Sequence, residues 1–337
     1  MITVAQDTVS KLAALGVKRQ RLTVDSRSVA PGDVFVALPG LSVDGRQFAA
    51  AAQACGAVAI LCEPGSQLTA EIDIPIVYVE GLSLNLGEIA DVFYDKPSTK
   101  VHVYGVTGTN GKTSIANWLA QAFTMLGQPC GSIGTLGLSF GERHWSTQNT
   151  TPDAASVHTA LRDLHAYGAE AVALEVSSHA LELGRVKGVR FEAVIFTNLT
   201  QDHLDFHGSM DAYGTAKTRL FTDYPSRYRI INADDPFGAR LIERALPNTI
   251  SFGMESGAVR GAILAMSATG MRLGISYQGK TEVFATKLIG RFNASNLLAV
   301  ATTLLATGAP LLRVVDTLSQ LSPAPGRMQR VNGNSVA

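Results

Sequence analysis

Apolar residues along this chain form two kinds of pattern. Short apolar runs predict buried strands, and longer stretches with one apolar face predict helices. In the first part of the chain we expect strands at 34–38, 58–61 and 76–79 and helices at 48–54 and 84–94. Strands that alternate with short helices are typical of a small α/β domain. Lys96-Pro97-Ser98 then indicates a linker, so this domain is expected to span residues 1–97.

The pattern after residue 98 predicts a larger α/β domain that extends to about residue 325. We expect buried strands at 101–106, 171–174, 193–196 and 230–231 and helices at 114–126, 155–167, 212–221 and 290–306. Between residues 249 and 288, short alternating strands favour antiparallel structure appended to the parallel sheet. The predicted fold class is therefore α/β, with a small N-terminal domain and a mostly parallel central domain that carries an antiparallel part.

Composition and charge narrow the class of protein. The 337 residues are 46% hydrophobic and 17% charged, which is typical of globular domains with a large core. The formal net charge of zero argues against a polyanion-binding surface, so no nucleic-acid partner is expected. The three cysteines lack zinc-type spacing, which favours buried thiols in a reducing cytoplasm. Neither a signal peptide nor a membrane span is indicated.

The strongest chemical signal is the stretch from Val101 to Thr113, Val-His-Val-Tyr-Gly-Val-Thr-Gly-Thr-Asn-Gly-Lys-Thr. A predicted strand, a glycine-rich turn, Lys112, Thr113 and an amphipathic helix follow one another. This order is that of a phosphate cradle, in which backbone N–H groups face the anion, the lysine adds positive charge and the hydroxyl can ligate Mg²⁺. Val106 stands where the general P-loop motif has glycine, so the motif is a variant. The alternative, an ordinary strand-to-helix turn, is disfavoured because all the features occur in order.

Polar residues after two other predicted strands are candidate metal ligands. Glu175 follows strand 171–174, at the sheet edge where a P-loop also lies, and a carboxylate there suits Mg²⁺. A capping or loop carboxylate is the alternative. Strand 193–196 is followed by two histidines and two aspartates, Asp202, His203, Asp205 and His207. They form a candidate metal or acid–base cluster, with helix-capping aspartates as the alternative for some of them.

Three weaker signals leave alternatives open. Ser26 and the loop 41–43 can line a ligand site at strand ends, but Asp25 and Arg27 are equally a structural pair in a turn, and the residues alone favour the structural interpretation. Lys217 lies in a predicted helix among small residues, which by itself indicates a solvated lysine. An amide near the start of the last helix either contacts a base or caps the helix.

Several motifs together resemble those of the Mur ligases. They are 105–113, Glu175-Val-Ser-Ser-His179, Thr197–Asp205 and Gly290–Asn296, with Asp25–Arg27, Pro31–Asp33 and Asp44–Gly45 resembling the family's N-terminal domain. The resemblance covers essentially the whole chain. It is greatest for the members that add the third residue of the peptidoglycan stem peptide, meso-diaminopimelate or L-lysine. The sister ligases that add the terminal dipeptide resemble the second and third motifs less well.

The resemblance implies an ATP-dependent amide ligase of cell wall biogenesis. Its substrate would be UDP-N-acetylmuramoyl-L-alanyl-D-glutamate, whose free carboxylate is phosphorylated by ATP to an acyl phosphate. The amine of an amino-acid acceptor would then displace phosphate through a tetrahedral intermediate. Lys112 and two Mg²⁺ ions would stabilise charge on the transferring phosphoryl group. We expect a cytoplasmic monomer.

The resemblance also implies roles for individual residues. The ATP contacts would be Gly108, Thr109, Asn110, Gly111, Lys112, Thr113, Ser114, Asn296 (adenine) and Arg327. Thr113 and Glu175 would bind one Mg²⁺, and His203 a second one together with Lys217, which CO₂ converts to a carbamate with anionic oxygens. Lys112, His203 and Lys217 would be catalytic. The substrate contacts would be Val24, Ser26, Leu41, Ser42, Val43, Asn149, Thr150, Thr151, Ser177, Leu183 and Arg185. Leu183 stands where some relatives have Gln.

Members of this family have a third domain that carries the acceptor site. Residues 326–337 are expected to be its beginning, so we interpret the chain as a truncated form that binds substrate with little turnover. Two alternatives remain, a folylpolyglutamate synthase-like ligase and a non-catalytic nucleotide-binding fragment. The Asp25-Ser-Arg27 motif argues against the first, and the missing domain favours the second. A P-loop motor or kinase would require glycine at position 106 and lack the 175–179 motif.

Overall fold

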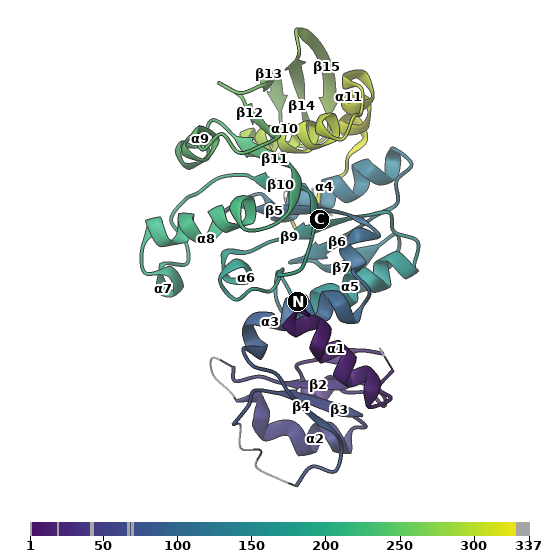
Figure 1. Ribbon diagram of the computed structural model, residues 1–337. Coiled ribbons are helices and arrows are strands. Elements are labelled where there is room, and N and C mark those ends of the chain that lie inside the picture. The colour runs from purple at the N-terminus through teal and green to yellow at the C-terminus, as the bar shows by residue number, and fades with distance from the viewer. Residues whose placement is uncertain (1, 19, 41–43, 66–67, 69–70, 328–337) are drawn as a thin grey trace, which may run out of the picture. The chain divides into compact units, whose positions relative to one another are not determined.

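The computed structural model describes residues 2–18, 20–40, 44–65, 68 and 71–327. Contacts divide the chain into two units (Figure 1). The N-terminal unit comprises Met1–Val101, Pro152–Tyr167 and Ala180–Arg190, and the central unit comprises His102–Thr151, Gly168–His179 and Phe191–Ala337. Two segments from the middle of the chain therefore pack with the N-terminal unit. The division into functional domains near residues 97 and 325 stays a prediction.

The N-terminal unit is built on a four-stranded parallel sheet. In spatial order its strands are β1 (Leu22–Thr23), β2 (Val34–Ala37), β3 (Ala59–Cys62) and β4 (Ile76–Tyr78). Alternate residues face opposite sides of the sheet. Val34 and Val36 pack with helices α1 (Val4–Ala14) and α3 (Leu82–Phe93), whereas Phe35 and Ala37 pack with α2 (Ala49–Ala54). Helix α5 (Ala154–Ala166) packs against α3 and begins after Asp153, which caps it.

Helix α1 was not expected from the sequence. It starts with a capping box, in which the Thr3 hydroxyl accepts the Gln6 N–H at 3.2 Å and the Gln6 side chain accepts the Thr3 N–H at 3.0 Å. Ala5, Val9 and Leu12 then lie on one face and are buried. A threonine followed three residues later by glutamine is the signal that identifies this helix start.

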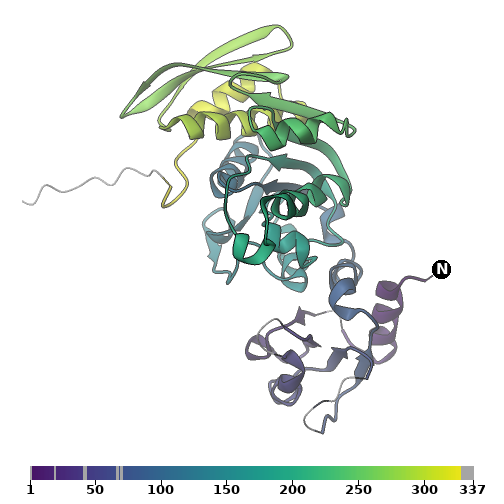
Figure 2. The same ribbon diagram turned by 90° about the vertical axis from the view of Figure 1, so that its left-hand side faces the viewer.

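Within the described residues, the central unit contains an eleven-stranded sheet (Figures 1 and 2). Its spatial order is β15-β14-β13-β12-β11-β10-β5-β9-β6-β7-β8. The bounds are β5 (His102–Thr107), β6 (Cys130–Gly134), β7 (Gly137–Phe140), β8 (Arg143–Trp145), β9 (Ala171–Glu175), β10 (Phe191–Phe196), β11 (Ser226–Asn232), β12 (Thr249–Gly253), β13 (Val259–Ser267), β14 (Gly270–Tyr277) and β15 (Lys280–Thr286). The sheet is parallel from β6 to β13, and both ends are antiparallel hairpins. The predicted α/β class is confirmed.

The antiparallel part begins later in the chain than expected. Strands β13, β14 and β15 pair antiparallel as predicted. Strand β12, however, runs parallel to both of its neighbours, β11 and β13. The expectation of antiparallel structure from residue 249 is therefore wrong for β12, because this strand follows helix α9 (Pro236–Glu243), a crossover that returns the chain in the same direction.

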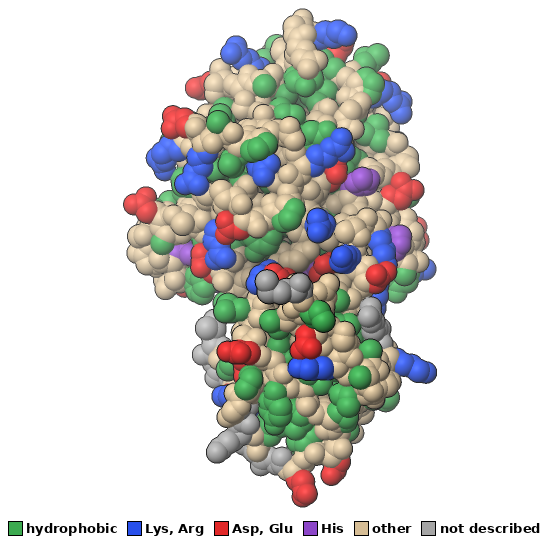
Figure 3. Space-filling model, viewed as in Figure 1, with side chains coloured by type: hydrophobic (Ala, Val, Ile, Leu, Met, Phe, Trp, Pro, Cys, Tyr) green, Lys and Arg blue, Asp and Glu red, His purple; other side chains and the backbone are tan. Residues whose placement is uncertain are grey.

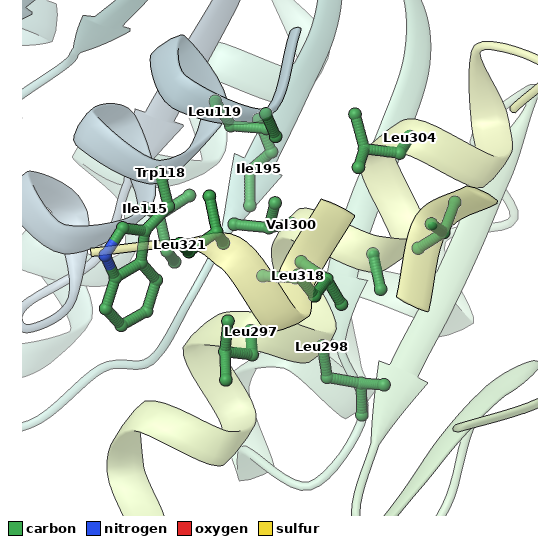
Figure 4. Close-up of a cluster of buried hydrophobic side chains, with 14 of the residues drawn as sticks. Ile115, Trp118, Leu119, Ile195, Leu297, Leu298, Val300, Leu304, Leu318 and Leu321 are labelled. Carbon is green, nitrogen blue, oxygen red and sulfur yellow. The ribbon is translucent and has the colours of Figure 1, made fainter. Parts of the chain in front are cut away.

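Three helices cover one face of the central sheet, namely α4 (Lys112–Met125), α10 (Arg291–Ala306) and α11 (Leu311–Gln320). Helix α11 was not expected. Figure 4 shows part of their shared core, in which the side chains are Ile115, Trp118, Leu119, Ile195, Leu297, Leu298, Val300, Leu304, Leu318 and Leu321. The Trp118 indole N–H donates to the Ser322 carbonyl at 2.9 Å, which ties α4 to the chain after α11.

On the other face of the sheet, Phe196 of β10 contacts Phe221 of α8 (Met210–Thr222) and Phe237 of α9, with ring centroids 6.4 and 5.7 Å apart. Two further short α-helices among the described residues are α6 (Ser178–Glu182) and α7 (Leu204–His207). Basic and acidic side chains are interspersed over the visible surface (Figure 3), in keeping with the zero net charge. In the described part of the chain, every helix is too short or too polar to span a membrane.

Candidate functional site

A glycine-containing turn joins the central strand β5 to helix α4. Gly108 has φ of +143° and Gly111 has φ of +89°, both in the region that favours glycine. A Cβ at Gly108 would overlap the Thr197 hydroxyl, and a Cβ at Gly111 would lie 2.5 Å from Asn296 Oδ1. Because α4 begins at Lys112, the positive end of its dipole lies at this turn. The sequence predicted this strand, turn and helix in the order observed.

The loop after β10 holds the turn in place. The Asn198 side chain accepts the Asn110 N–H at 2.9 Å, and the Asn198 carbonyl accepts the Thr109 N–H at 2.9 Å. The Thr197 hydroxyl donates to the Asn110 carbonyl at 2.6 Å, and the Thr109 hydroxyl donates to the Thr200 carbonyl at 3.1 Å. The turn is therefore fixed by its neighbours. Sequence reasoning identified this stretch but not the role of Asn198.

Two lysines converge on one carbonyl of the turn. Lys112 Nζ donates to the Gly108 and Thr109 carbonyls at 2.8 and 2.9 Å, and Lys217 Nζ from α8 donates to the Gly108 carbonyl at 3.0 Å. The Lys217 ammonium also lies 4.4 Å from the centre of the Tyr213 ring. Among the described residues, no carboxylate is within ion-pair distance of either lysine. The interpretation of Lys217 as a solvated lysine is wrong, since only 1% of the residue is exposed.

Burial weakens the affinity of both amines for protons. It lowers the pKa of Lys112, although the charges of Glu175 and Asp202 oppose this shift, and the charge of Arg327 adds to it. The pKa of Lys217 falls well below its ordinary value through burial and through the neighbouring charge of Lys112. Lys112 therefore supplies positive charge that suits an anion at this turn, whereas burial favours the neutral form of the Lys217 amine.

Glu175 ends strand β9 with a buried carboxylate. Its Oε2 accepts the Thr113 hydroxyl at 3.0 Å, and its Oε1 accepts the Thr135 N–H at 2.8 Å. Burial raises the pKa of this carboxylate, although the bonds from Thr135 and Thr113 oppose the shift. A Cβ at Gly134 would overlap Oε1, so glycine is needed for this approach. The Thr113 hydroxyl and the Glu175 carboxylate are hard oxygen donors on adjacent groups, which fits Mg²⁺.

Thr135 was not singled out from the sequence. The signal that could have found it is the glycine-rich segment 131–141, which brings backbone close to the carboxyl end of β9. Strand β6 within this segment pairs with β9.

The histidine-rich stretch after β10 is arranged differently from the expected cluster. His203 begins α7 with φ of +51°, and its Nε2 lies 3.5 Å from an Asp202 carboxylate oxygen. His207 instead contacts Ser178, with 2.9 Å between Nε2 and Oγ. The His179 ring lies against His203, with centroids 4.9 Å apart. In the ranges that the structure describes, no three or more His, Cys, Asp or Glu side chains are grouped so as to hold a metal. His203 as a ligand stays a prediction.

Two other expected ATP contacts lie near the turn. Asn296, near the start of α10, is buried, and its Oδ1 faces Gly111. Arg327 is exposed, and its charge reaches Lys112, as the pKa of that lysine reflects. The structure thus brings both residues to the segment predicted to bind ATP.

The expected substrate contacts of the central unit lie beside Glu175. The Thr151 hydroxyl donates to the Glu175 carbonyl at 2.8 Å and accepts the Ser177 N–H at 3.0 Å. Asn149 and Thr150 directly precede Thr151 in the loop that leads to this contact. Thr151 therefore joins the end of β9 to the loop that carries Ser177.

In the N-terminal unit, Val24 packs against the core and Ser26 starts the 3-10 helix η1 (Ser26–Ser28). The Asp25 carboxylate accepts the Arg27 N–H at 3.0 Å and pairs with its guanidinium at 2.7 Å. Asp25 and Arg27 therefore form the structural pair that the residues alone favoured. The expected contacts Leu41, Ser42 and Val43 lie outside the described residues.

Leu183 and Arg185 lie in the segment that packs with the N-terminal unit. Leu183 is exposed, whereas Arg185 is half-buried. Burial lowers the pKa of Arg185, and the charge of Asp153 opposes that shift.

The turn, the paired lysines and the Thr113–Glu175 contact have the arrangement of a variant P-loop at the carboxyl ends of parallel strands. Over residues 106–304 the chain matches the family described as "Mur ligase middle domain", and over residues 20–94 it matches "Mur ligase family, catalytic domain". Because the first match covers more than half of the sequence, the chain belongs to the Mur ligase family.

Individual relatives agree with this assignment. The chain is 44% identical over 328 residues to the UDP-N-acetylmuramoyl-L-alanyl-D-glutamate--2,6-diaminopimelate ligase of Pseudomonas putida, covering 93% of this chain and 66% of the relative. A solved structure of a ligase with that name is similar at a TM-score of 0.80 and 31% identity, covering 93% of this chain and 65% of the other. The chain spans just under two thirds of the length of the curated relatives.

A more distant likeness bears on one alternative. A folylpolyglutamate synthase from Thermotoga maritima is similar at a TM-score of 0.57 and 13% identity, covering 71% of this chain and 62% of the other. Identity this low indicates a shared fold alone.

Proposed function

We propose that this chain belongs to a ligase that uses ATP to join 2,6-diaminopimelate to UDP-N-acetylmuramoyl-L-alanyl-D-glutamate. The names of relatives at 44% identity support the two substrates and favour diaminopimelate over L-lysine, which the sequence left open. The observation that carries the proposal is the convergence of Lys112 and Lys217 on the Gly108 carbonyl, next to the Thr113–Glu175 hydrogen bond. This set of groups suits the transfer of a phosphoryl group from ATP to a carboxylate.

The phosphates of ATP would bind at residues 108–114. The N–H groups of Thr109 and Asn110 are already bonded to Asn198, so recognition by backbone falls to Gly111–Ser114 at the start of α4. Lys112 lies on the turn, and its ammonium would neutralise phosphate charge. Binding an anion would in turn relieve the cost of burying that ammonium.

The contacts at the two ends of the nucleotide would come from other segments. The Asn296 amide beside Gly111 is a candidate for the adenine edge. Arg327, whose charge reaches Lys112, is a candidate for the phosphates.

Thr113 and Glu175 would hold Mg²⁺, which supplies positive charge to the phosphates when bound. The raised pKa of Glu175 supports this role, because a nearby cation would offset the cost of its buried negative charge. The lowered pKa of Lys217 increases the neutral fraction of its amine, and a neutral amine is the form that reacts with CO₂. A carbamate there would be an anionic oxygen ligand, together with His203, for a second Mg²⁺.

In the proposed reaction, one free carboxylate of the D-glutamate residue attacks the terminal phosphorus of ATP, the bond from that phosphorus to the bridging oxygen breaks, and ADP leaves. The amine of diaminopimelate then attacks the resulting acyl phosphate, and inorganic phosphate leaves. Lys112 would stabilise charge that develops on the transferred group. Asn149, Thr150, Thr151, Ser177, Leu183 and Arg185 would contact the UDP-sugar-peptide, with Val24, Ser26 and residues 41–43 on the uridine part.

The test separates binding from turnover, because the relatives extend over a further third of their length. UDP-N-acetylmuramoyl-L-alanyl-D-glutamate is titrated calorimetrically into the protein, with UDP-N-acetylglucosamine and tetrahydrofolate as controls. Binding of the muramoyl dipeptide alone is expected. Binding of tetrahydrofolate alone would favour the folylpolyglutamate synthase-like alternative, and absence of all binding to folded protein would overturn the substrate proposal.

A ligation assay with ATP and diaminopimelate then measures turnover. Little turnover is expected from this chain, and the rate of a full-length relative would overturn that expectation. Substrate binding without any hydrolysis of ATP would favour the non-catalytic alternative.

A further inference from the structure

Asp91 and His158 face each other inside the N-terminal unit and lie outside the candidate site. His158 of α5 is fully buried, and Asp91 of α3 is largely buried. The His158 Nδ1 and Asp91 Oδ1 atoms are 3.8 Å apart. Both atoms are shielded from solvent, and neither has a hydrogen-bond partner among the described residues. Two orphan polar atoms pointing at one another require an explanation.

The other ring nitrogen fixes the tautomer of His158. Its Nε2 lies 2.9 Å from the Lys187 carbonyl, and since a carbonyl only accepts, Nε2 must carry a proton. In a neutral imidazole Nδ1 is then a bare acceptor. An ionised Asp91 is also acceptor-only, so the two atoms would repel each other in a buried site. A single proton between them removes that repulsion, and a shift of about 1 Å in the Asp91 carboxyl closes a normal hydrogen bond.

The surroundings favour a pair that holds one proton and no net charge. Burial raises the pKa of Asp91 to about 6, and burial lowers the pKa of His158 to about 4. The charged groups facing Asp91 are Lys96 and Arg190, which lower its pKa, and Glu88, which raises it. Both shifts disfavour separated charges, as expected for groups removed from water.

The pair is packed tightly against the turn around Lys187. A Cβ at Gly87 of α3 would overlap the Lys187 carbonyl. Gly188 has φ of +87°, and a Cβ there would lie 3.0 Å from Asp91 Cβ and 3.2 Å from His158 Nε2. The space between α3, α5 and this turn is therefore filled, and the Lys187 carbonyl is held by the histidine.

We propose that Asp91 and His158 share one proton and are positioning residues for Arg185, which lies in the turn held by His158. The role for Arg185 rests on the proposed function, in which this guanidinium contacts the UDP-sugar-peptide. The link is short, because the Lys187 N–H donates to the Gly184 carbonyl at 3.0 Å and the Arg185 N–H donates to the Ala180 carbonyl at 2.8 Å. When the shared proton is lost, the one remaining imidazole proton is drawn from Nε2 to Nδ1, which faces the Asp91 carboxylate. Nε2 then no longer donates to the Lys187 carbonyl, and the backbone that carries Arg185 loosens.

The first test compares the pH dependence of stability in the wild type and Asp91→Asn. In the wild type the folded pair takes up one proton near pH 6, and the unfolded histidine takes up one near its ordinary pKa of about 6.5. Folding then changes proton binding little, so this pair leaves stability nearly constant between about pH 7.5 and 5.5.

In Asp91→Asn the amide cannot take up a proton, and burial keeps the pKa of the His158 imidazole low. Below about pH 6.5 the unfolded state therefore binds one more proton than the folded state, and stability falls as the pH falls. The folding equilibrium constant should drop up to about tenfold per pH unit relative to the wild type, measured by urea denaturation at three pH values. Asp95→Asn is the matched control, because Asp95 is exposed and paired with Lys100. If stability changes with pH in the same way in the wild type and in Asp91→Asn, the proposal that the two residues share a proton is wrong.

The second test follows ligand binding by the wild type from about pH 5.5 to 7.5, the range in which the folded pair loses its shared proton. Affinity for UDP-N-acetylmuramoyl-L-alanyl-D-glutamate should fall by about tenfold over this range, because a guanidinium misplaced by about 1 Å loses directed hydrogen bonds. Asp91→Asn should show no such fall, because its amide can donate to the His158 Nδ1 at every pH. Affinity for a non-hydrolysable ATP analogue should not change, since that site lies in the central unit. An affinity for the UDP ligand that changes with pH equally in the wild type and in Asp91→Asn would overturn the positioning role. If the wild type itself fails to bind the UDP ligand, the proposed function is wrong. The pH profiles of stability still show whether Asp91 and His158 share a proton.

A third measurement needs no substitution and applies even if Asp91→Asn does not fold. Long-range ¹H–¹⁵N NMR of the wild type reports the state of both ring nitrogens of His158. A hydrogen-bonded Nδ1 at about pH 5.5 is expected. The signature of a bare Nδ1 at that pH would overturn the proposal.

Discussion

The candidate sites of the two units are held together in opposite ways. In the N-terminal unit, Asp25 and Asp44 each accept, at 3.0 Å, the N–H of the arginine two residues later and pair with its guanidinium. These local turns start η1 and η2 (Gly45–Phe48). In the central unit, the turn and helix start at residues 108–114, called the cradle below, depend on partners far away in sequence, such as Asn198 for Asn110 and Lys217 for Gly108. A site of the first kind can be altered one residue at a time, whereas a site of the second kind depends on the whole sheet.

The largest effect should follow the loss of the central cation of the cradle. Lys112→Ala should lower the affinity for an ATP analogue by about 10³-fold, because among the described residues Lys112 alone donates to both the Gly108 and Thr109 carbonyls. Calorimetric titration measures it. Lys100→Ala is the control. It removes an exposed lysine that is paired with Asp95, and its affinity for the ATP analogue should equal that of the wild type. If the affinity of Lys112→Ala falls by less than about tenfold, nucleotide binding does not depend on the long-range contacts of the cradle, and the two units do not differ in this way.

The Thr197 hydroxyl lies so close to Gly108 that it leaves no room for a side chain at this position. Gly108→Ala should reduce the free energy of unfolding by about 3 kcal/mol, since the new Cβ meets Thr197 in a backbone conformation that favours glycine. Gly127→Ala is the matched control, with φ of +86° and open space around it, and should cost about 1 kcal/mol. Urea denaturation compares the two. Equal losses would mean that backbone conformation alone matters.

Glu175→Gln should separate function from stability. Without the carboxylate, Mg²⁺-dependent nucleotide binding should fall by about 100-fold. The free energy of unfolding should stay the same or rise, because a buried charge with a raised pKa has been removed. Glu170→Gln, at an exposed position, is the control for both measurements. A loss of more than about 2 kcal/mol in stability would make Glu175 a structural residue instead.

The smallest effects are expected in the local turns. Asp25→Ala removes the cap of η1 and should cost about 1 kcal/mol in thermal or urea denaturation. Arg27→Ala should leave stability unchanged, because the guanidinium is exposed to solvent and screened. A marked loss in Arg27→Ala would show that the turn is held by more than its local bonds.

The sequence predicted what is encoded locally. The change of period at residue 114 and the glycines before it place β5, the turn and α4 correctly. At least three helices escaped prediction although their signals are local, and one of them is α9, which starts with the Asp235 cap and Pro236. Helix α1 has a capping box at Thr3, and α11 follows Pro310 with Val314, Val315 and Leu318 on one buried face.

Other features depend on tertiary structure and could not be predicted. The direction of β12 is fixed by its neighbours, and the burial of Lys217 follows from a partner 109 residues away. The role of Thr135 likewise appears only when β6 lies beside β9. Candidate residues can therefore be predicted where strands end, but their contacts require knowledge of which strands are adjacent.

Helix α4 also provides the protein with its own optical reporter. The cradle forms the start of this helix, and Trp118, one of only two tryptophans in the chain, lies on the same helix with its indole N–H on the Ser322 carbonyl. Indole emission depends on such a hydrogen bond and on its buried surroundings. In a Trp145→Phe background Trp118 is the single indole, so any change that occupancy of residues 108–114 transmits along α4 would be read from tryptophan emission, without a dye or a labelled nucleotide.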